Sequence, residues 1–201
     1  MILAKLIRGL DTLLRCYRHI YEFSQDKDCL LRLAIAASDR DLTLSDGARI
    51  AQGELIGEIH LWNEHIPAIP RSGPDLAWGR TVRHQLARSW AELAAYIEAA
   101  PDFQPIRAFR GEMAFVNAEG LGQAITLAQR WGFEFVKPDQ PAGSWRRLGA
   151  FWRNLYTLAL IWAFNPVSLR AKNPRGVQRG QFWISRAALL RKYGPRQQSV
   201  L

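Results

Sequence analysis

Residues 57–65 hold the densest group of side chains that can do chemistry, in the order Gly-Glu-Ile-His-Leu-Trp-Asn-Glu-His. On a strand, successive side chains alternate, so Glu58, His60 and Trp62 would share one face. The carboxylate and the imidazole suit an acid–base pair, or the carboxylate orients the ring. They equally suit hydrogen bonding to a sugar or a lipid headgroup, with Trp62 as an apolar platform and Asn63 as a further ligand-binding side chain. The plain alternative is an edge strand with one wet face and a loop at Asn63.

A second polar group, Arg107, Arg110 and Glu112, lies in the segment IRAFRGEMAFV, whose pattern predicts a strand. If this strand lies beside the first, its polar side chains complete one pocket with Glu58 and His60. The pocket would then be that of a small enzyme, with Glu58 or His60 as general base and Arg110 as a clamp for an anion. Glu112 is the remaining catalytic candidate. An internal ion pair between Arg and Glu is the structural alternative.

Metal and cofactor motifs are not recognisable in the chain. His60 and His65 lack the spacing of metal ligands on a helix, and Cys16 and Cys29 have neither CxxC spacing nor paired histidines nearby. The two cysteines are therefore expected to be reduced thiols, and no metal and no cofactor is expected. The chain also has no GxSxG, P-loop, GxGxxG or HExxH sequence, so the residues alone leave open whether it catalyses a reaction.

Short apolar runs bounded by turn residues predict strands. Four of them lie close together, LLRLAIAAS (30–38), DLTL (41–44), ARIA (48–51) and ELIGEIHLW (54–62). The Asp46-Gly47 pair between two of these runs predicts a hairpin, because a tight turn requires positive φ. Three more strands are expected in IRAFRGEMAFV (106–116), FEFV (133–136) and QFWIS (181–185).

Apolar residues at helical spacing predict amphipathic helices over residues 2–23, from Val82 to a point before Pro101, and over 120–132, 144–166 and 186–194. The first of these suits packing against a core or contact with a membrane surface or a partner. Strands and helices together predict an α+β fold, with a mixed, largely antiparallel sheet covered by amphipathic helices and a helical, basic C-terminal third. A length of 201 residues fits a single domain, 1–201.

Charge is distributed unevenly along this domain. The net charge is +9, yet every Asp and Glu lies at or before Asp139, and residues 140–201 hold eleven Arg or Lys. Residues 1–139 carry the other sixteen basic side chains and all eighteen acidic ones, so they form a near-neutral body of about −2. The basic segment 140–201 therefore calls for an anionic partner, which would be anionic lipid, nucleic acid or an acidic protein.

Tryptophans interleave with arginines in the basic segment. The rings are Trp145, Trp152, Trp162 and Trp183. At a membrane surface, indole rings lie at headgroup depth while guanidinium groups meet phosphates. The side chains expected to contact a membrane or another anion are Trp145, Arg146, Arg147, Trp152, Arg153, Arg170, Lys172 and Arg175. Nucleic acid suits the same composition, although no nucleic-acid-binding motif accompanies it, and a third interpretation makes the rings core and the arginines a solvated face. The apolar stretch between Asn154 and Asn165 is too short to span a bilayer.

The motif Gly53-x3-Gly57-Glu58-x-His60-x2-Asn63, after a hairpin and before a long helix, resembles the YkoP-like domain of bacteria over about residues 30–137. That domain occurs alone or beside polysaccharide deacetylase domains, which implies an envelope-related setting in glycan or glycolipid metabolism. Deacetylase chemistry is not implied, because the Asp-His-His metal pattern of the catalytic domain is missing, and no catalytic residues carry over. The passage AITLAQRWGFEFV also resembles the helix-to-strand end of GNAT-type acetyltransferases, but their pyrophosphate loop is absent.

These observations lead to an expected function as an accessory or ligand-binding domain, peripheral to the membrane, with an anionic membrane surface and a polar glycan or lipid headgroup as partners. Charged residues spread through 2–23 instead of an apolar signal region, so the cytoplasm and the inner face of the membrane are the expected location. A small transferase or hydrolase acting on an envelope glycan or lipid precursor is the first alternative. A nucleic-acid-binding protein is the second.

Overall fold

The computed structural model describes residues 20–62, 64–70, 72–115, 118–137 and 178–195. Five strands form its main sheet, in the order β1-β4-β5-β7-β6. These strands are β1 (Leu31–Ala37), β4 (Leu55–Leu61), β5 (Ala108–Phe115), β7 (Gln178–Ser185) and β6 (Glu134–Val136). A two-stranded hairpin, β2 (Leu42–Thr43) and β3 (Arg49–Ile50), stands apart from the main sheet. All seven predicted strands are present.

Three of the four pairings in the main sheet are antiparallel: β1 with β4, β5 with β7, and β6 with β7. The parallel pair, β4 and β5, is joined through the helix α2 (Leu76–Ala99) and the 3-10 turn η1 (Pro101–Phe103). Strand β7 comes from the basic segment but lies between β5 and β6, so the end of the chain completes the same sheet. The predicted α+β class with a mixed, largely antiparallel sheet is confirmed.

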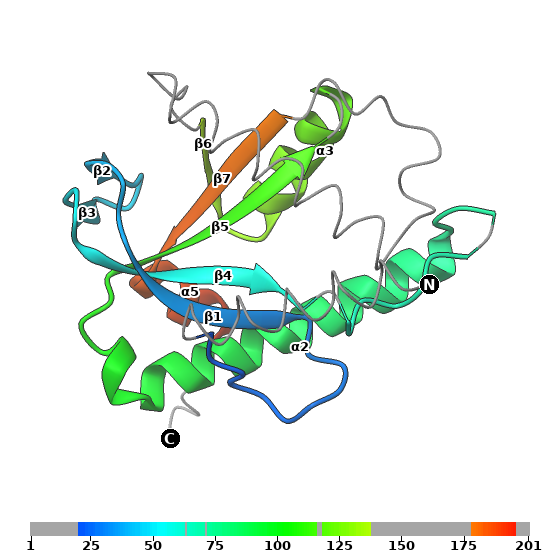
Figure 1. Cartoon of the computed structure of the whole chain (residues 1–201), viewed down its shortest axis with the longest axis horizontal. Helices are drawn as coiled ribbons and strands as arrows, with labels where there is room; N and C mark the ends of the chain where they lie inside the picture. The colour runs from blue at the N-terminus through cyan, green and yellow to red at the C-terminus, as the bar shows by residue number, and fades with distance from the viewer. Residues whose placement is uncertain (1–19, 63, 71, 116–117, 138–177, 196–201) are drawn as a thin grey trace, which may run out of the picture.

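The two faces of the sheet are covered differently (Figure 1). Helices α2, α3 (Ala118–Arg130) and α5 (Arg186–Tyr193) pack on one face, where Leu33, Ile59 and Phe109 join the larger core with Leu93 of α2 and Leu189 of α5. The hairpin covers one end of the other face and forms a second core there. The buried residues of this core are Leu44, Ile50, Ile56, Ala108 and Trp183. The rest of that second face carries charged side chains.

The helix α2 begins directly after a capping residue, six residues before the predicted start at Val82. Asp75 is its N-cap and accepts a hydrogen bond from the amide of Trp78 at 2.7 Å. The strands pair as far as Thr43 and Arg49, and a hydrogen bond from the Leu44 amide to the Ala48 carbonyl then closes the turn around residues 45–47, where Gly47 has a φ of +84°. Gly132 has the same φ after α3, as expected of a glycine that ends a helix.

The predicted helix over residues 2–23 is wrong at its C-terminal end, and residues 1–19 lie outside the described residues. Tyr21 is extended and pairs with Leu33 of β1, with hydrogen bonds of 2.6 and 3.1 Å between their backbones. Pairing with the edge strand satisfies backbone groups that a free edge would expose. The Tyr21 ring also packs edge-on against Phe103 at 5.3 Å.

Gly57 is required for packing, since a Cβ atom at this position would overlap the ring of Phe109, which is fully buried. We expect G57A to lower the free energy of unfolding by about 1–3 kcal/mol, the usual cost of forcing extra volume into a core. Gly79 in α2 is the matched control, because a Cβ there meets nothing within 4 Å. G79A should instead stabilise the protein by up to about 1 kcal/mol. Urea unfolding measures both, and equal effects would refute the packing role of Gly57.

Candidate functional site

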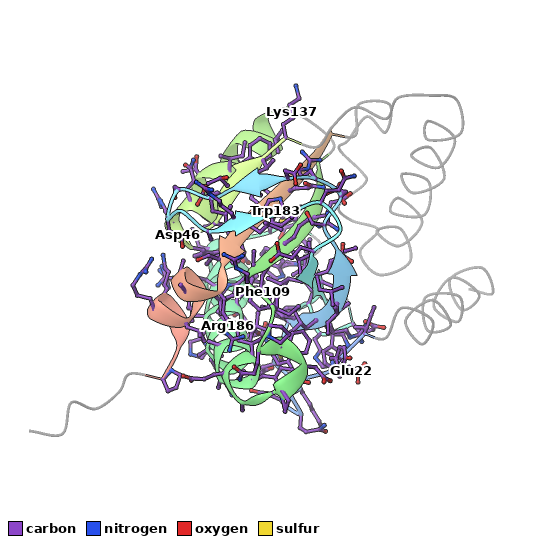
Figure 2. The ribbon with its side chains drawn as sticks, turned by 90° about the vertical axis from the view of Figure 1, so that its left-hand side faces the viewer. Glu22, Asp46, Phe109, Lys137, Trp183 and Arg186 are labelled. Carbon is purple, nitrogen blue, oxygen red and sulfur yellow. The ribbon has the colours of Figure 1, made fainter. Side chains whose placement is uncertain are left out.

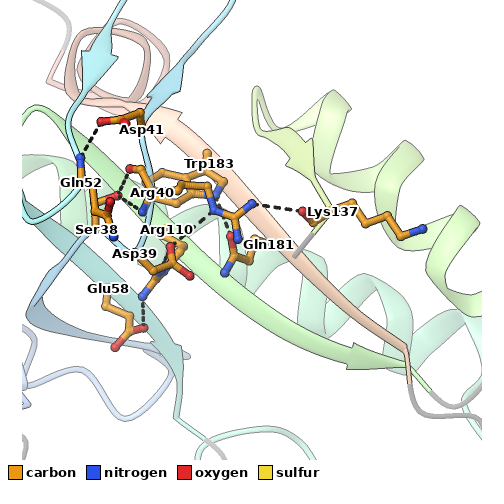
Figure 3. A network of polar contacts seen from close by, with 10 residues as sticks. All are labelled: Ser38, Asp39, Arg40, Asp41, Gln52, Glu58, Arg110, Lys137, Gln181 and Trp183. Atoms are coloured by element: carbon orange, nitrogen blue, oxygen red, sulfur yellow. Dashed lines mark hydrogen bonds and ion pairs between the residues drawn. The ribbon is translucent and has the colours of Figure 1, made fainter. Parts of the chain in front are cut away.

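The centre of the charged face is Arg110, which bonds to two carboxylates. In the parallel register Arg110 of β5 lies directly opposite Glu58 of β4, and its Nη2 donates to Glu58 at 2.9 Å. Its Nη1 donates to Asp39, at the base of the hairpin, also at 2.9 Å. Figure 3 shows the guanidinium group between the two carboxylates. The side chain of Arg110 is only 9% exposed, so this ion pair is a buried one.

Burial and neighbouring charges act in opposite directions on the two carboxylates. Contact with the His60 ring, followed by the charge of Arg110, outweighs burial and lowers the pKa of Glu58 to about 2. Burial raises the pKa of Asp39, but Arg110 and Arg40 outweigh it, and the pKa lies below its usual value. Both groups are therefore ionised at neutral pH, and Glu58 is too weak a base to take up a proton there.

His60 joins the cluster from the same strand as Glu58. Its Nε2 lies 3.4 Å from Oε2 of Glu58, within ion-pair distance. Among the described residues, however, this nitrogen has no hydrogen-bond partner, and neither has Nε of Arg110, although both atoms are buried. Buried polar atoms are normally hydrogen-bonded, so two orphaned nitrogens in one cluster indicate a position where a ligand or a water molecule completes the bonding.

Trp62 lies beyond His60 and is enclosed on both sides. The His65 ring stacks on it with centroids 3.8 Å apart, and the guanidinium carbon of Arg32 is 4.1 Å from the Trp62 ring. Two groups this close to one ring must lie on opposite faces. The buried Arg32 is also 3.5 Å from the carboxylate of Glu64. A ligand can therefore reach Trp62 only at its edge unless one neighbour moves, and the platform role stays a prediction.

The structure brings together four of the predicted site residues. Glu58 and His60 share one face of β4, as the alternation predicted, and Arg110 and the exposed Glu112 occupy the same face of β5. Arg107 points elsewhere, because its side chain is 61% exposed and lies 4.0 Å from Glu54. Some predicted site residues lie outside the described residues, namely Asn63, Trp145, Arg146, Arg147, Trp152, Arg153, Arg170, Lys172 and Arg175.

Two residues of the charged face were missed in the sequence. Asp39 supplies half of the charge that balances Arg110, yet it lies 71 positions away in the chain. Its neighbours Ser38 and Arg40 read as ordinary turn residues. Arg32 interrupts the apolar run of β1 and is 4% exposed, and this interruption was the one available signal, because a charge within a buried strand needs a partner.

Trp183 lies in the core, which is one of the alternatives left open for the tryptophans of the basic segment, another being a membrane surface. The residue is fully buried under the hairpin, and its Nε1 donates to Gln181 at 3.4 Å (Figure 2). Arg110 lies over its ring, with the guanidinium carbon 5.5 Å from the ring centroid. Trp183 therefore forms the floor below Arg110, as in the interpretation of these tryptophans as core.

A hollow of about 600 Å³ opens on another part of the surface, lined among others by Ser45, Asp46, Glu134, Ser185, Arg191 and Lys192. Several of its polar groups already have hydrogen-bond partners. Glu134 accepts from the amide and the hydroxyl of Ser45, Asp46 accepts from the hydroxyl of Ser185, and Lys192 donates to a backbone carbonyl. The hollow thus offers a ligand fewer open partners than the charged face does.

The low pKa of Glu58 makes a prediction for acid stability. The pKa of the Glu58 carboxyl group falls from 4.5 to about 2 on folding. Its ionised form therefore stabilises the folded protein fully above pH 4.5, and this contribution is lost as the pH falls towards 2. Between pH 4.5 and pH 3 the loss is about 2 kcal/mol from this group. In E58Q this part of the decline should vanish, whereas E98Q, which removes an exposed carboxylate of α2, should follow the wild type. Urea unfolding at several pH values checks it, and a decline in E58Q as steep as in the wild type would contradict it.

Neither a cluster of metal ligands nor a membrane-spanning helix is present within the described ranges. No group of three or more His, Cys, Asp or Glu side chains there is arranged to hold a metal ion. No helix within the same ranges is long and apolar enough to cross a membrane. Cys29 is a free, buried thiol whose pKa is raised by burial, and Cys16 lies outside the described residues.

Comparison with known proteins gives one match. No curated protein and no solved structure matches the chain significantly. The sequence profile of the YkoP domain matches residues 1–193. This range is wider than the stretch 30–137 that carries the resemblance, and it includes most of the basic segment, which lies outside that stretch. Because the match covers nearly the whole chain, the protein belongs to the YkoP domain family.

Proposed function

We propose that this protein is a non-catalytic binding domain that holds a polar, hydroxyl-bearing ligand at the Arg110–Glu58–His60 cluster. We further propose that it is an accessory protein of envelope glycan or glycolipid metabolism, peripheral to the inner face of the membrane. The observation that carries the ligand site is the pair of buried nitrogens, Nε of Arg110 and Nε2 of His60, which have no hydrogen-bond partner among the described residues and lie beside two ionised carboxylates.

The charges of the cluster select the class of ligand. Arg110 already faces two carboxylates, so its positive charge is balanced and an anion gains little there. The cluster offers both donors and acceptors: Nε of Arg110, the His60 ring and the carboxylate oxygens. A hydroxyl group both donates and accepts hydrogen bonds, and an amine can replace it opposite the carboxylates. A neutral sugar or an amino sugar therefore fits better than a phosphorylated one.

The ligand site can be tested with a small panel of probes: glucose, N-acetylglucosamine, glucosamine and glycerol phosphate. We expect a neutral or amino sugar of this panel to bind the full chain in calorimetry, and E58Q to weaken it by about tenfold or more, since a charge-assisted hydrogen bond contributes about 1.5–3 kcal/mol. E98Q is the matched control, an exposed carboxylate remote from the cluster, and should bind as the wild type does. Binding of glycerol phosphate alone, or equal affinity in E58Q, would reject the site.

The membrane part of the proposal is supported by the composition of the basic segment, in which eleven Arg or Lys and no Asp or Glu follow Asp139. Near an anionic leaflet each cation contributes about 1 kcal/mol. Replacing Arg146, Arg147 and Arg153 by Gln in the full chain should therefore weaken binding to vesicles of phosphatidylglycerol and phosphatidylcholine by roughly a hundredfold. Flotation of the wild type that is the same with and without phosphatidylglycerol would reject the membrane role.

A small enzyme is the second candidate, favoured by the placement of His60, Glu58 and Arg110 in one cluster. Because the pKa of Glu58 is about 2, the base in such an enzyme would be His60, with Glu58 orienting its ring. Incubation of the wild type and of H60N in water with an oligosaccharide of the sugar that binds best, which offers a glycosidic bond to hydrolyse, separates the two candidates. A product that forms only with the wild type supports the enzyme, and an unchanged sugar supports the binding domain.

A further inference from the structure

A second charged surface lies on α2, far from the cluster described above. Leu76, Arg80, Arg83 and His84 are all exposed: Arg80 lies four residues after Leu76, and Arg83 and His84 lie three and four residues after Arg80. Ala87 follows three residues after His84. At 3.6 residues per turn these positions lie on one side of the helix. The first half of α2 therefore presents a stripe, the α2 face, that carries an apolar residue at its beginning and cations after it.

The cations of the α2 face have no counter-charge on the helix. No Asp or Glu stands three or four residues from Arg80, Arg83 or His84, and the first turn holds no acidic residue. Within the described residues, none of these three side chains is in an ion pair or a hydrogen bond. One turn further along, by contrast, Arg88 pairs with Asp26 and approaches Asp28 to 3.8 Å.

This arrangement works against the stability of the helix. Like charges at spacings of three and four residues destabilise a helix by a few tenths of a kcal/mol per pair. An external anion on the α2 face relieves this repulsion.

The chain itself has little to supply as that anion. Outside the described residues the acidic side chains are Asp11 and Asp139, and every other charged side chain there is Lys or Arg. The undescribed part of the chain thus carries a strong excess of positive charge. An anion that pairs with the α2 face would therefore be supplied by another molecule.

Leu76 favours an anionic lipid bilayer over nucleic acid as the partner of the α2 face. It is 81% exposed, the highest value among the exposed large hydrophobic side chains of the described residues, and it lies on the same stripe as the arginines. An apolar side chain beside cations suits a bilayer, where it enters the acyl boundary while guanidinium groups meet phosphates. A nucleic-acid backbone is contacted through charged and hydrogen-bonding groups, so an exposed aliphatic side chain beside the arginines would add no contact to it.

We propose that the α2 face docks on an anionic lipid surface, with Leu76 inserted and Arg80 and Arg83 at the headgroup phosphates. The inference rests on the proposed membrane role and adds a second contact to it, on residues remote from the basic C-terminal segment in sequence. The face lies at the opposite end of the sheet from the β2–β3 hairpin, so a surface for a matched control is available there (Figure 1).

The test compares R80Q/R83Q with R49Q/R107Q in the full chain. Both variants lose two exposed arginines, the first pair from the α2 face and the second from β3 and from the residue before β5. With vesicles of phosphatidylglycerol and phosphatidylcholine, R80Q/R83Q should lower the partition constant about thirtyfold, at about 1 kcal/mol for each arginine, and R49Q/R107Q should leave it within about threefold. Thermal unfolding should show R80Q/R83Q to be as stable as the wild type or more so, because its like charges are gone.

A third variant identifies the anionic partner. L76S should weaken binding to the vesicles and leave binding to a single-stranded oligonucleotide unchanged. If the wild type fails to bind acidic vesicles, the membrane role and this inference fall together. If the wild type binds and R80Q/R83Q binds equally well, only the α2 face is refuted. Loss of oligonucleotide binding in R80Q/R83Q, with vesicle binding intact, would assign the face to nucleic acid instead.

Discussion

R110M is expected to lower the free energy of unfolding by about 3–5 kcal/mol, the usual cost of removing one partner from a buried ion pair. Without the guanidinium group, Glu58 stays in the interior with its side chain 18% exposed and its negative charge unbalanced. Asp39, which is half exposed, is solvated more easily. R107M is the control, because the side chain of Arg107 is 61% exposed and its loss should cost under about 1 kcal/mol.

The double variant R110M/E58M separates a buried charge from a lost contact. A buried pair replaced on both sides by apolar side chains is often neutral in stability. R110M/E58M should therefore regain most of the stability that R110M loses, while E58M alone leaves the charge of Arg110 shared with Asp39. Urea unfolding of the four proteins at pH 7 gives the coupling energy. A double variant as unstable as the sum of the single ones would show that the pair is not a coupled unit.

W183A is expected to cost about 3–5 kcal/mol, as truncations of buried aromatic side chains do. Trp183 is 0% exposed, and it packs under the hairpin with Ile56 and Ala108. W183F keeps part of the packing but leaves Gln181 without the donor that it now contacts, so it should cost less than W183A. Thermal unfolding and vesicle binding should be measured together. Unchanged stability with weakened vesicle binding would return Trp183 to the membrane surface and overturn its role in the core.

The alternation of side chains within β4 could be predicted, because it depends on the strand alone. Glu58 and His60 lie on the charged face while Ile59 enters the helical core, as the period of two requires. The parallel neighbour of β4 could only be assumed, since the pairing with β5 is made across the whole of α2. Local pattern does not determine such a non-local pairing, and the approach of Arg110 to Glu58 follows entirely from it.

Trp183 shows where composition misleads. Its place in a segment rich in Arg and Trp suggested a membrane surface, but its immediate neighbours Phe182 and Ile184 are apolar too, and they are 4% and 1% exposed. Three apolar residues in succession indicate a strand buried on both faces, because alternating positions then all face a core. This local run was the better guide to the place of Trp183 than the charge of the surrounding segment.

The cluster was incomplete in the sequence for a further reason. Asp39 reaches Arg110 only because of the fold at the base of the hairpin. There the amide of Ser38 donates to the carbonyl of Glu54 at 2.8 Å, which places the next residue, Asp39, near β5. The exposed polar residues of a turn give no sign of such a contact. The charge balance of Arg110, on which the choice of a hydroxyl-bearing ligand rests, therefore became visible only in three dimensions.

The nuclear magnetic resonance signal of the Arg110 Nε–H group tests the ligand site most directly, because this group is buried and lacks a hydrogen-bond partner among the described residues. Titration with the sugar that binds best should shift this signal with the same midpoint as calorimetry. The corresponding signal of Arg186, whose guanidinium group donates to Ile97 and Phe103 near the helices, should stay in place. If the sugar binds while the Arg110 signal does not move, or if no neutral or amino sugar moves it at millimolar concentration, the cluster is not the binding site.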